Sequence, residues 1–356
     1  MQFYRKISAL SILVLLVASL SAQVNDCNIT RTFPARKGVA LRLTNKYGDV
    51  NFITVNNDSI TVCGVITIVQ DNKDLVKSNL KLVSIKIERV KDTVLVATSY
   101  DKKFFSEESR QGRKSFSVDY LVKMPSYIDL NVTNEFGNVS ADEMSGTFNV
   151  RLSQGILSAK KLTKGNIRPL SSIYTDHSQI NIEEMNWMAL TLFNCTSVDI
   201  EKAQALTMKS SISKVKMGEV GSLICNSKSD SYNIRSINNL LSESIYSEFE
   251  IGLLRGQVKS KATYGSIRIS GVTRDFSSID IVAGQARVIL EPGEGVSFRA
   301  DISATDASVE FPVLKYPGII KNVNNYNTTL TGITGTDKET KSLIRIRTTA
   351  GKLSIQ

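Results

Sequence analysis

The chain has 356 residues, of which 42% are hydrophobic and only six are prolines, so it can build a sizeable core and lacks the composition of a disordered protein. Lysine and arginine number 44 against 34 acidic residues, and the resulting formal net charge of +10 favours acidic partners. A single histidine and four cysteines without a C-x-x-C motif exclude a Cys/His metal cage, and we expect no cofactor.

The chain begins with the pattern of an export signal. Arg5 and Lys6 precede an apolar run over residues 9–20 that ends in small residues, and this run is short for a membrane span. We therefore predict that residues 1–22 are a cleaved signal peptide and that the mature chain begins near Gln23 with a net charge of +8 and no transmembrane span. The expected location is the periplasm, the outer-membrane surface or the medium.

The cysteines fit an exported protein without defining a disulfide. Cys27 and Cys63 lie in the amino-terminal region, where an oxidising compartment allows a bridge, and the sequence leaves that pairing open. Cys195 and Cys225 occupy different places in the repeat described below. We interpret them as buried small apolar residues.

Residues 23–125 form the first predicted region of the mature chain. Its expected elements, in chain order, are strands within 26–69, a short helix over 71–82, a hairpin of 83–88 and 93–97 around Lys91 and Asp92, an exposed charged loop over 101–114, and a strand over 115–124.

A five-residue pattern then recurs: a small residue followed by polar, apolar, polar and apolar residues. From Val139 to Val309 its central apolar residues, which we call markers, are spaced 15 to 23 residues apart. The twelve markers are Val50, Val139, Leu157, Ile180, Val198, Val215, Ile234, Phe249, Ile267, Ala286, Val309 and Leu353. The residue after each marker is never apolar, which indicates one buried strand face and a tight corner before each strand.

This repeat predicts an all-β protein, a single-stack β-solenoid (β-helix) preceded by the strand and short-helix region. Each repeat is one rung that buries its apolar face against its neighbours. The predicted solenoid covers residues 126–356, with a long loop at about 315–341 and a closing strand over 343–355.

Three segments carry a resemblance to a known family. The run Val118-Asp119-Tyr120-Leu121-Val122-Lys123-Met124-Pro125, the run from Leu130 to Val139 and the ending from Ile344 to Ile355 resemble the exported bacterial proteins of the putative adhesin family, many from Bacteroidetes. The resemblance covers most of the chain from about Leu41. It implies a right-handed β-solenoid and gives no catalytic residue to carry over.

Two arrangements could support an enzyme. His177 and Cys195 each lie three residues before a marker of neighbouring rungs, so they could approach as a Cys-His nucleophile. We favour the simpler explanation, a solvated corner histidine and a cysteine that faces the core. A polysaccharide lyase or glycosidase needs clustered carboxylates, whereas Asp199, Glu250 and Glu310 are predicted to be scattered over the outer face. A carbohydrate-active β-helix enzyme is therefore the alternative function.

Binding is the function that we favour, and it has four candidate residues. Tyr246 and Tyr264 hold the same place in consecutive rungs and are predicted to stack, and Arg268 and Arg287 are predicted to be adjacent like charges. The other outward charges are interpreted as a solvated ladder, with Asp199 beside Lys216 and Arg235, Glu250 and Arg268 in sequence. We expect a non-enzymatic envelope protein or adhesin whose partners are anionic glycans or envelope or host surface components, and no nucleic acid.

Overall fold

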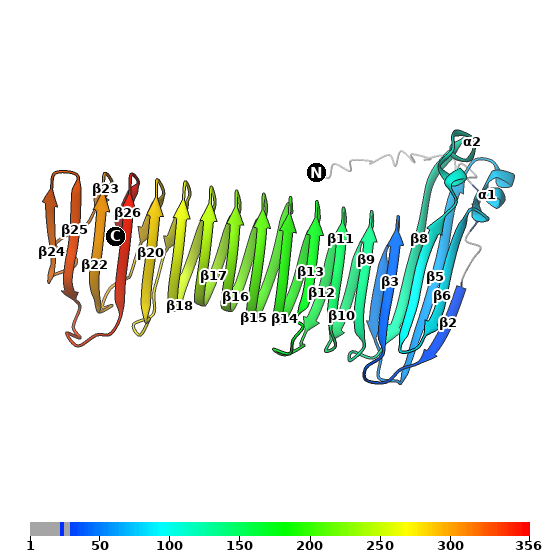
Figure 1. Ribbon diagram of the computed structural model, residues 1–356, viewed down its shortest axis with the longest axis horizontal. Coiled ribbons are helices and arrows are strands. Elements are labelled where there is room, and N and C mark those ends of the chain that lie inside the picture. Colours follow the sequence, from blue (N-terminus) through cyan, green and yellow to red (C-terminus); the bar gives the residue numbers. More distant parts are fainter. Residues whose placement is uncertain (1–21, 25–28) are drawn as a thin grey trace, which may run out of the picture.

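The computed structural model describes residues 22–24 and 29–356 as one elongated body built mostly of strands (Figure 1). Strands β1 to β27 join in one mixed sheet. The predicted signal, apart from Ala22, lies outside the described residues, as does Cys27, so the export signal and the Cys27–Cys63 pairing stay predictions. None of the helices in the described ranges has the length and hydropathy to cross a membrane.

The amino-terminal region contains eight strands and three short helices. The strands are β1 (Ala22–Val24), β2 (Ile29–Pro34), β3 (Ala40–Lys46), β4 (Val50–Thr54), β5 (Ser59–Gln70), β6 (Val83–Val90), β7 (Thr93–Tyr100) and β8 (Arg113–Met124), and the helices are α1 (Lys73–Leu80), η1 (Lys102–Phe105) and α2 (Glu107–Arg110). The predicted helix and hairpin are confirmed. Asn72 caps α1 by accepting the amide of Asp74 at 2.8 Å, and β6 pairs antiparallel with β7.

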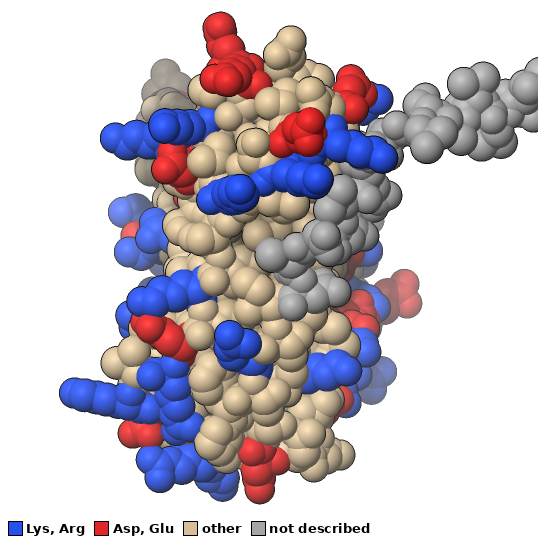
Figure 2. Space-filling model, turned by 90° about the vertical axis from the view of Figure 1, so that its right-hand side faces the viewer, with Lys and Arg blue, Asp and Glu red and all other residues tan. Residues whose placement is uncertain are grey.

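The predicted loop over 101–114 is wrong, because η1 and α2 lie within it. Asp101 caps η1 by accepting the amide of Lys103 at 2.8 Å, and Ser106 caps α2. Phe104 is fully buried and packs edge-on against Phe116, with ring centroids 4.9 Å apart. A charged stretch that contains one buried aromatic ring and two capping residues therefore folds back onto the strands. At this end of the molecule acidic and basic side chains are interspersed over the surface (Figure 2).

The middle of the chain consists of strands that pair in parallel with their counterparts in the next repeat. They are β9 (Asp129–Glu135), β10 (Val139–Met144), β11 (Phe148–Ser153), β12 (Ile156–Leu162), β13 (Ser171–Asp176), β14 (Gln179–Phe193), β15 (Ser197–Ser211), β16 (Lys214–Lys228), β17 (Ser231–Ile245) and β18 (Glu248–Thr263). Each of β14 to β18 pairs along both halves. A repeat thus has a marker half and a return half.

We call the two outer surfaces that these halves form the marker face and the return face. The marker face comprises β4, β10, β12, the first halves of β14 to β18, and β19, β21, β27 and β23; the return face comprises β3, β9, β11, β13, the second halves, and β20, β26 and β22. The strands lie across the long axis of the molecule and are stacked side by side along it (Figure 1). Val50 lies directly opposite Val139, so the two repeats that contain them are stacked on each other. Residues 55–128 are therefore an insertion in the chain between these two repeats.

The two halves share one core. Tyr232 of the marker half is 1% exposed, and its hydroxyl contacts Sδ of Met208, from the return half, at 3.2 Å. Phe249 stacks on the Tyr232 ring with centroids 4.5 Å apart. The alternation of apolar and polar residues follows from this arrangement, because every second side chain of each half enters the shared core.

Two predicted markers are displaced by two residues. The residue opposite Val215 and Phe249 is Tyr232 and not Ile234, and the residue opposite Ile267 is Val288 and not Ala286. All four of these marker-half residues are buried, since a shift of two keeps a side chain on the same side of a strand. The apolar pattern alone therefore could not choose between the two registers.

The carboxyl-terminal part contains β19 (Ser266–Ile269), β20 (Ser278–Gly284), β21 (Arg287–Leu290), β22 (Phe298–Thr305), β23 (Ser308–Glu310), β24 (Ile319–Asn324), β25 (Asn327–Thr334), β26 (Leu343–Thr349) and β27 (Lys352–Ile355). The predicted loop at about 315–341 is wrong, because β24 and β25 form an antiparallel hairpin that pairs with β22. Its Asn and Gly residues include the turn residue Asn325, which has a φ of 51°.

The predicted closing strand exists, but it does not close the stack. β26 pairs in parallel with β20 on one side and β22 on the other, and β27 likewise lies between β21 and β23. Arg345 contacts both neighbours of β26, Asp280 at 3.8 Å and Asp301 at 3.2 Å. The last two strands are therefore inserted between strands that precede them in the sequence.

Candidate functional site

A tight corner joins the return half of each repeat to the next marker half, and it places one exposed side chain per repeat in a row that we call the ridge. Every ridge residue has a positive φ, between 49° and 63°, although none is glycine. In stacking order the ridge residues are Tyr47, Phe136, Gln154, His177, Asn194, Ile212, Ser229, Tyr246, Tyr264, Gln285, Ala350 and Asp306. Each donates its amide to a carbonyl of the next repeat, which holds the unfavourable conformation in place.

The recurring small residue of the sequence pattern directly follows the ridge residue, and the close stacking of the corners explains its small size. A Cβ added to Gly137 would lie 2.0 Å from the carbonyl oxygen of Gly48, and one added to Gly265 would lie 2.1 Å from that of Ser247. The stacked backbones approach too closely there for a large side chain. The corner thus turns its small residue inward and its ridge residue outward.

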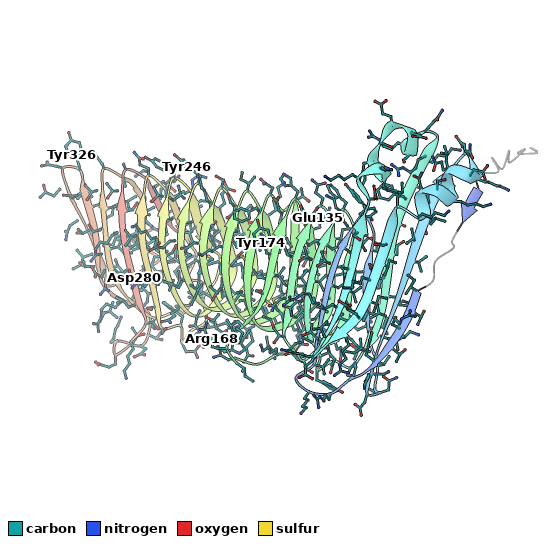
Figure 3. The ribbon with its side chains drawn as sticks, turned by 45° about the vertical axis from the view of Figure 1, so that its right-hand side comes forward. Glu135, Arg168, Tyr174, Tyr246, Asp280 and Tyr326 are labelled. Atoms are coloured by element: carbon teal, nitrogen blue, oxygen red, sulfur yellow. The ribbon has the colours of Figure 1, made fainter. Side chains whose placement is uncertain are left out.

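Tyr246 and Tyr264 stack on the ridge as the sequence predicted. Their ring centroids are 5.0 Å apart with an interplanar angle of 13°, and both rings are about half exposed. Figure 3 places Tyr246 at the upper edge of the ribbon, where the corners lie. The stacked pair is therefore accessible to a ligand and is not part of the core.

A hollow of about 540 Å³ lies beside this pair, and Arg287 and Lys352 are among the residues that line it. Within the described residues Arg287 has no ion-pair partner, whereas Lys352 contacts Glu310 at 2.6 Å. The hydrogen bond from Lys352 holds the pKa of Glu310 below its usual value. Glu248 also lines the hollow. We call Tyr246, Tyr264, Arg287 and Lys352 the ridge site, which consists of two stacked rings beside one cation without an ion-pair partner and one paired cation.

Arg268 does not belong to the ridge site. It lies opposite Ile289 on the neighbouring strand, and its guanidinium contacts Glu291 at 2.6 Å. Arg287 is opposite Ser266 instead. The predicted adjacency of Arg268 and Arg287 is wrong, since the displaced marker at Ala286 moved Arg287 by two positions along its strand.

The predicted charge ladder on the marker face is partly right. Lys216 lies opposite Asp199 and contacts it at 3.3 Å, and Arg268 lies opposite Glu250. Arg235 is not next to Glu250, because Asn233 occupies that position, and it contacts Glu201 at 2.7 Å. The displaced marker at Ile234 caused this second error.

His177 and Cys195 are not brought together as a nucleophile and base. His177 is on the exposed ridge, where its Nδ1 lies 2.8 Å from Asp176 Oδ1. Cys195 is fully buried in the small-residue position of the next corner, 3.2 Å from the hydroxyl of Thr175. That corner has one extra residue, so Asn194 and not Cys195 stacks on His177.

A second hollow of about 530 Å³ on the marker face contains four carboxylates, which the sequence analysis did not predict. Asp142 contacts Lys160 at 2.8 Å, while Asp199 and Glu201 form the pairs with Lys216 and Arg235 described above. Glu183 has no ion-pair partner within the described residues. Nowhere in those residues do three or more acidic, cysteine or histidine side chains lie close enough to hold a metal ion.

One buried carboxylate has a structural role. Asp230 is 4% exposed and accepts hydrogen bonds from the hydroxyls of Ser210 and Ser227, both at 2.7 Å, and from the amides of Ser213 and Lys228. These donors satisfy the charge that burial would otherwise penalise. Burial also raises the pKa of the nearby Cys225 thiol to about 12, so this cysteine is an inert core residue, as predicted.

The sequence analysis missed the outer residues of the return face, because it followed only one strand of each repeat. Ile224, Leu241 and Val282 point outward there and are 44% to 49% exposed. The signal was present as consecutive apolar residues, such as Leu240-Leu241 and Ile281-Val282, where alternation predicts a polar residue. Lysines share this face, at Lys209, Lys228, Lys259 and Lys261.

Fold and ridge together define an elongated, mostly β protein that exposes rows of side chains. No protein-family model matches the chain, and no curated protein matches it. Solved structures similar to it include a "putative cell adhesion protein" from Clostridium sporogenes (12% identity, 92% of this chain and 99% of that chain, TM-score 0.17).

Two further similar structures are "putative adhesins". One is from Parabacteroides distasonis (9% identity, 92% and 96% coverage, TM-score 0.29) and the other from Bacteroides fragilis (13% identity, 93% and 98% coverage, TM-score 0.26). Such low identities and TM-scores leave fold and function to be argued from the chain's own contacts.

Proposed function

We propose that the chain is an exported, non-enzymatic envelope or surface protein that binds anionic glycans at the ridge site, and that its repeats form a right-handed β-solenoid. The solenoid is supported by the parallel register that runs from Val50 through Val139 and on to Leu353. A stack of repeats spreads its outer surface over a long body, which suits a binding protein that engages an extended polymer.

The observation that carries the glycan proposal is the pairing of two stacked, half-exposed tyrosines with an arginine that has no acidic partner in the described chain. Aromatic rings contact the apolar parts of sugar rings, and a guanidinium binds a carboxylate or sulfate in a bidentate way. Lys352 adds a second cation to the same hollow. The ligand class is therefore a uronic-acid or sulfated polysaccharide.

The test is a titration of the mature protein against sulfated and uronic-acid polysaccharides at two salt concentrations. Binding that weakens with salt and falls at least tenfold in Arg287→Gln and in Tyr264→Ala supports the proposal, whereas Arg268→Gln serves as the matched control, because that arginine is engaged by Glu291. Binding that ignores salt and all three substitutions contradicts it.

A carbohydrate-active enzyme is the second candidate, and the hollow with four carboxylates is the observation that favours it. Asp142, Asp199 and Glu201 each face a cation, which leaves Glu183 as the acid or base to test. Release of reducing ends or unsaturated sugars from a polysaccharide by the parent protein, and its loss in Glu183→Gln, would favour this candidate over the first.

A further inference from the structure

Between β14 and β20 the return face differs from the marker face in its exposed apolar side chains. Between β14 and β20 the described chain exposes eight large hydrophobic residues, five on the return face and three on the adjoining ridge, and none on the marker face. They are Phe193, Ile224, Leu241, Ile245 and Val282, with Ile212, Tyr246 and Tyr264 on the ridge. Ile224 and Leu241 lie directly opposite each other, and the remaining apolar residues are distributed around them. Exposed apolar side chains gathered on one face indicate a docking surface.

Lysines are interleaved with these apolar residues. The register places Lys209, Asn226, Glu243 and Lys261 in one row, with Lys228 and Lys259 in the rows on either side. Within the described residues none of the four lysines has an ion-pair partner. Glu243 lies in their midst, and Asp280, which contacts Arg345, lies opposite Lys259. A hollow of about 500 Å³ lies among Phe193, Ile245 and three of these lysines. The face is therefore apolar, shallow and cationic.

We propose that this return face docks on an anionic lipid bilayer. Aliphatic side chains such as Ile224 and Leu241 gain by entering the acyl boundary, and lysine stems can lie along an apolar surface while their ammonium groups reach phosphates. The strands of β14 to β20 span roughly 25 Å at about 4.8 Å per strand, so the contact is broad and matches a planar surface. Anionic headgroups complement the unpaired lysines.

Other occupants fit the charges or the apolar residues less well. A second copy placed face to face would bring four lysines and two carboxylates, Glu243 and Asp280, against the same set, and the net positive charge on both faces is repulsive. A polysaccharide offers partners to the lysines but no acyl region to the aliphatic residues. The bilayer proposal goes beyond the glycan function and uses different residues from the ridge-site cations.

The experiment is flotation of the full mature chain with phosphatidylcholine vesicles, with and without phosphatidylglycerol, at low and high salt. We expect binding only with phosphatidylglycerol. Lys209→Gln with Lys261→Gln should lower the partition coefficient about thirtyfold, since each lysine near an anionic surface contributes about 1 kcal/mol. Ile224→Ser with Leu241→Ser should lower it about tenfold.

Matched controls lie elsewhere on the surface. Lys123→Gln with Lys214→Gln removes two exposed lysines outside the return face, and Ile320→Ser with Val323→Ser removes two exposed aliphatic residues of β24. Both control pairs should float like the parent protein, and so should Arg287→Gln, which separates this proposal from glycan binding. Melting temperatures close to the parent's will show that all variants fold.

Three results would overturn the proposal. The first is equal flotation with neutral and anionic vesicles, or none with either. The second is a loss in the control pairs as large as in the return-face pairs. The third is a dimer in sedimentation equilibrium without lipid that Ile224→Ser with Leu241→Ser converts to monomer, which would assign the face to a second copy.

Discussion

The marker face and the return face of β14 to β20 have the same backbone pairing but opposite surface chemistry. On the marker face Lys216, Arg235 and Arg268 each contact a carboxylate. The return face carries Ile224, Leu241 and unpaired lysines at equivalent outward positions. Because backbone hydrogen bonds and inward side chains hold the strands together, the outward positions are free to differ. The difference between the faces therefore informs function and not fold.

The largest expected effect tests the claim that the two faces share one core. Ile267 of the marker half and Ile279 of the return half are 1% and 0% exposed. Replacing either by aspartate buries an unpaired charge and should cost about 4 kcal/mol of unfolding free energy, measured by urea denaturation. Arg268→Ser should cost less than about 1 kcal/mol. A mild effect at only one isoleucine would mean that the halves are not equivalent.

The second effect concerns the corner that joins the faces. Gly137→Ala places a Cβ against the carbonyl of Gly48, so the stacked backbones must separate, and we expect a loss of about 2 to 3 kcal/mol. Gly284→Ala is the control, since a Cβ added there meets nothing within 4 Å. Equal denaturation midpoints for the two variants would contradict the close corner stacking.

A smaller, pH-dependent effect lies at the end of the return face, where unpaired lysines give way to ion pairs. Hydrogen bonds from Arg347, at 2.7 Å, and Arg345 lower the pKa of Asp301. A carboxylate with a lowered pKa stabilises the fold above its unfolded pKa, and this contribution is lost as the pH falls through the folded pKa.

The parent protein should therefore be more stable than Asp301→Asn at neutral pH, by about 0.5 to 1 kcal/mol for a partly exposed pair. This advantage should disappear at about pH 2, below the usual range of an aspartate pKa. Thermal unfolding of both proteins across that range measures it. A constant difference at every pH would show that the charge of Asp301 is not responsible.

The smallest expected effect is on stability when the outer chemistry is exchanged. Ile224→Lys and Glu250→Leu each place the chemistry of one face on the other, and both positions are exposed. We expect changes within about 0.5 kcal/mol, read from denaturation midpoints. Losses of several kcal/mol from either change would mean that outward side chains also stabilise the pairing of the strands.

The inward half of the pattern could be predicted from sequence, because a buried strand face imposes alternation on every repeat. Register could not, since Tyr232 and Ile234 enter the same core and only pairing with Val215 distinguishes them. Because of this ambiguity, Arg235 was predicted to lie next to Glu250, and the predicted charge ladder is wrong at that position. The insertion of β26 between β20 and β22 was also hidden, because spacing along the chain does not report which distant strands pair.

The candidate site was predicted only in part, because each of its residues was placed relative to a marker and one of those markers was displaced. Tyr246 and Tyr264 are at a corner, where the position is fixed relative to a correctly placed marker, and their stacking is confirmed. Arg287 followed the displaced marker Ala286, so it was assigned the wrong neighbour. Outward apolar residues of the return half left a signal in consecutive apolar residues such as Leu240-Leu241, but only the pairing of both halves shows that they share one face.

The ridge has a consequence for how such a chain can change over time. Its backbone holds a left-handed conformation through hydrogen bonds to the next repeat, whether the side chain is His177, Ile212 or Tyr246. The conformation thus does not depend on which residue occupies the corner, and the side chain is exposed at ten of the twelve positions, the half-buried ones being Tyr47 and Asn194. A substitution at a ridge position therefore changes the side chain that a binding partner contacts and leaves the backbone unchanged. Successive ridge positions lie about 4.8 Å apart, so their side chains can be exchanged one by one along the row.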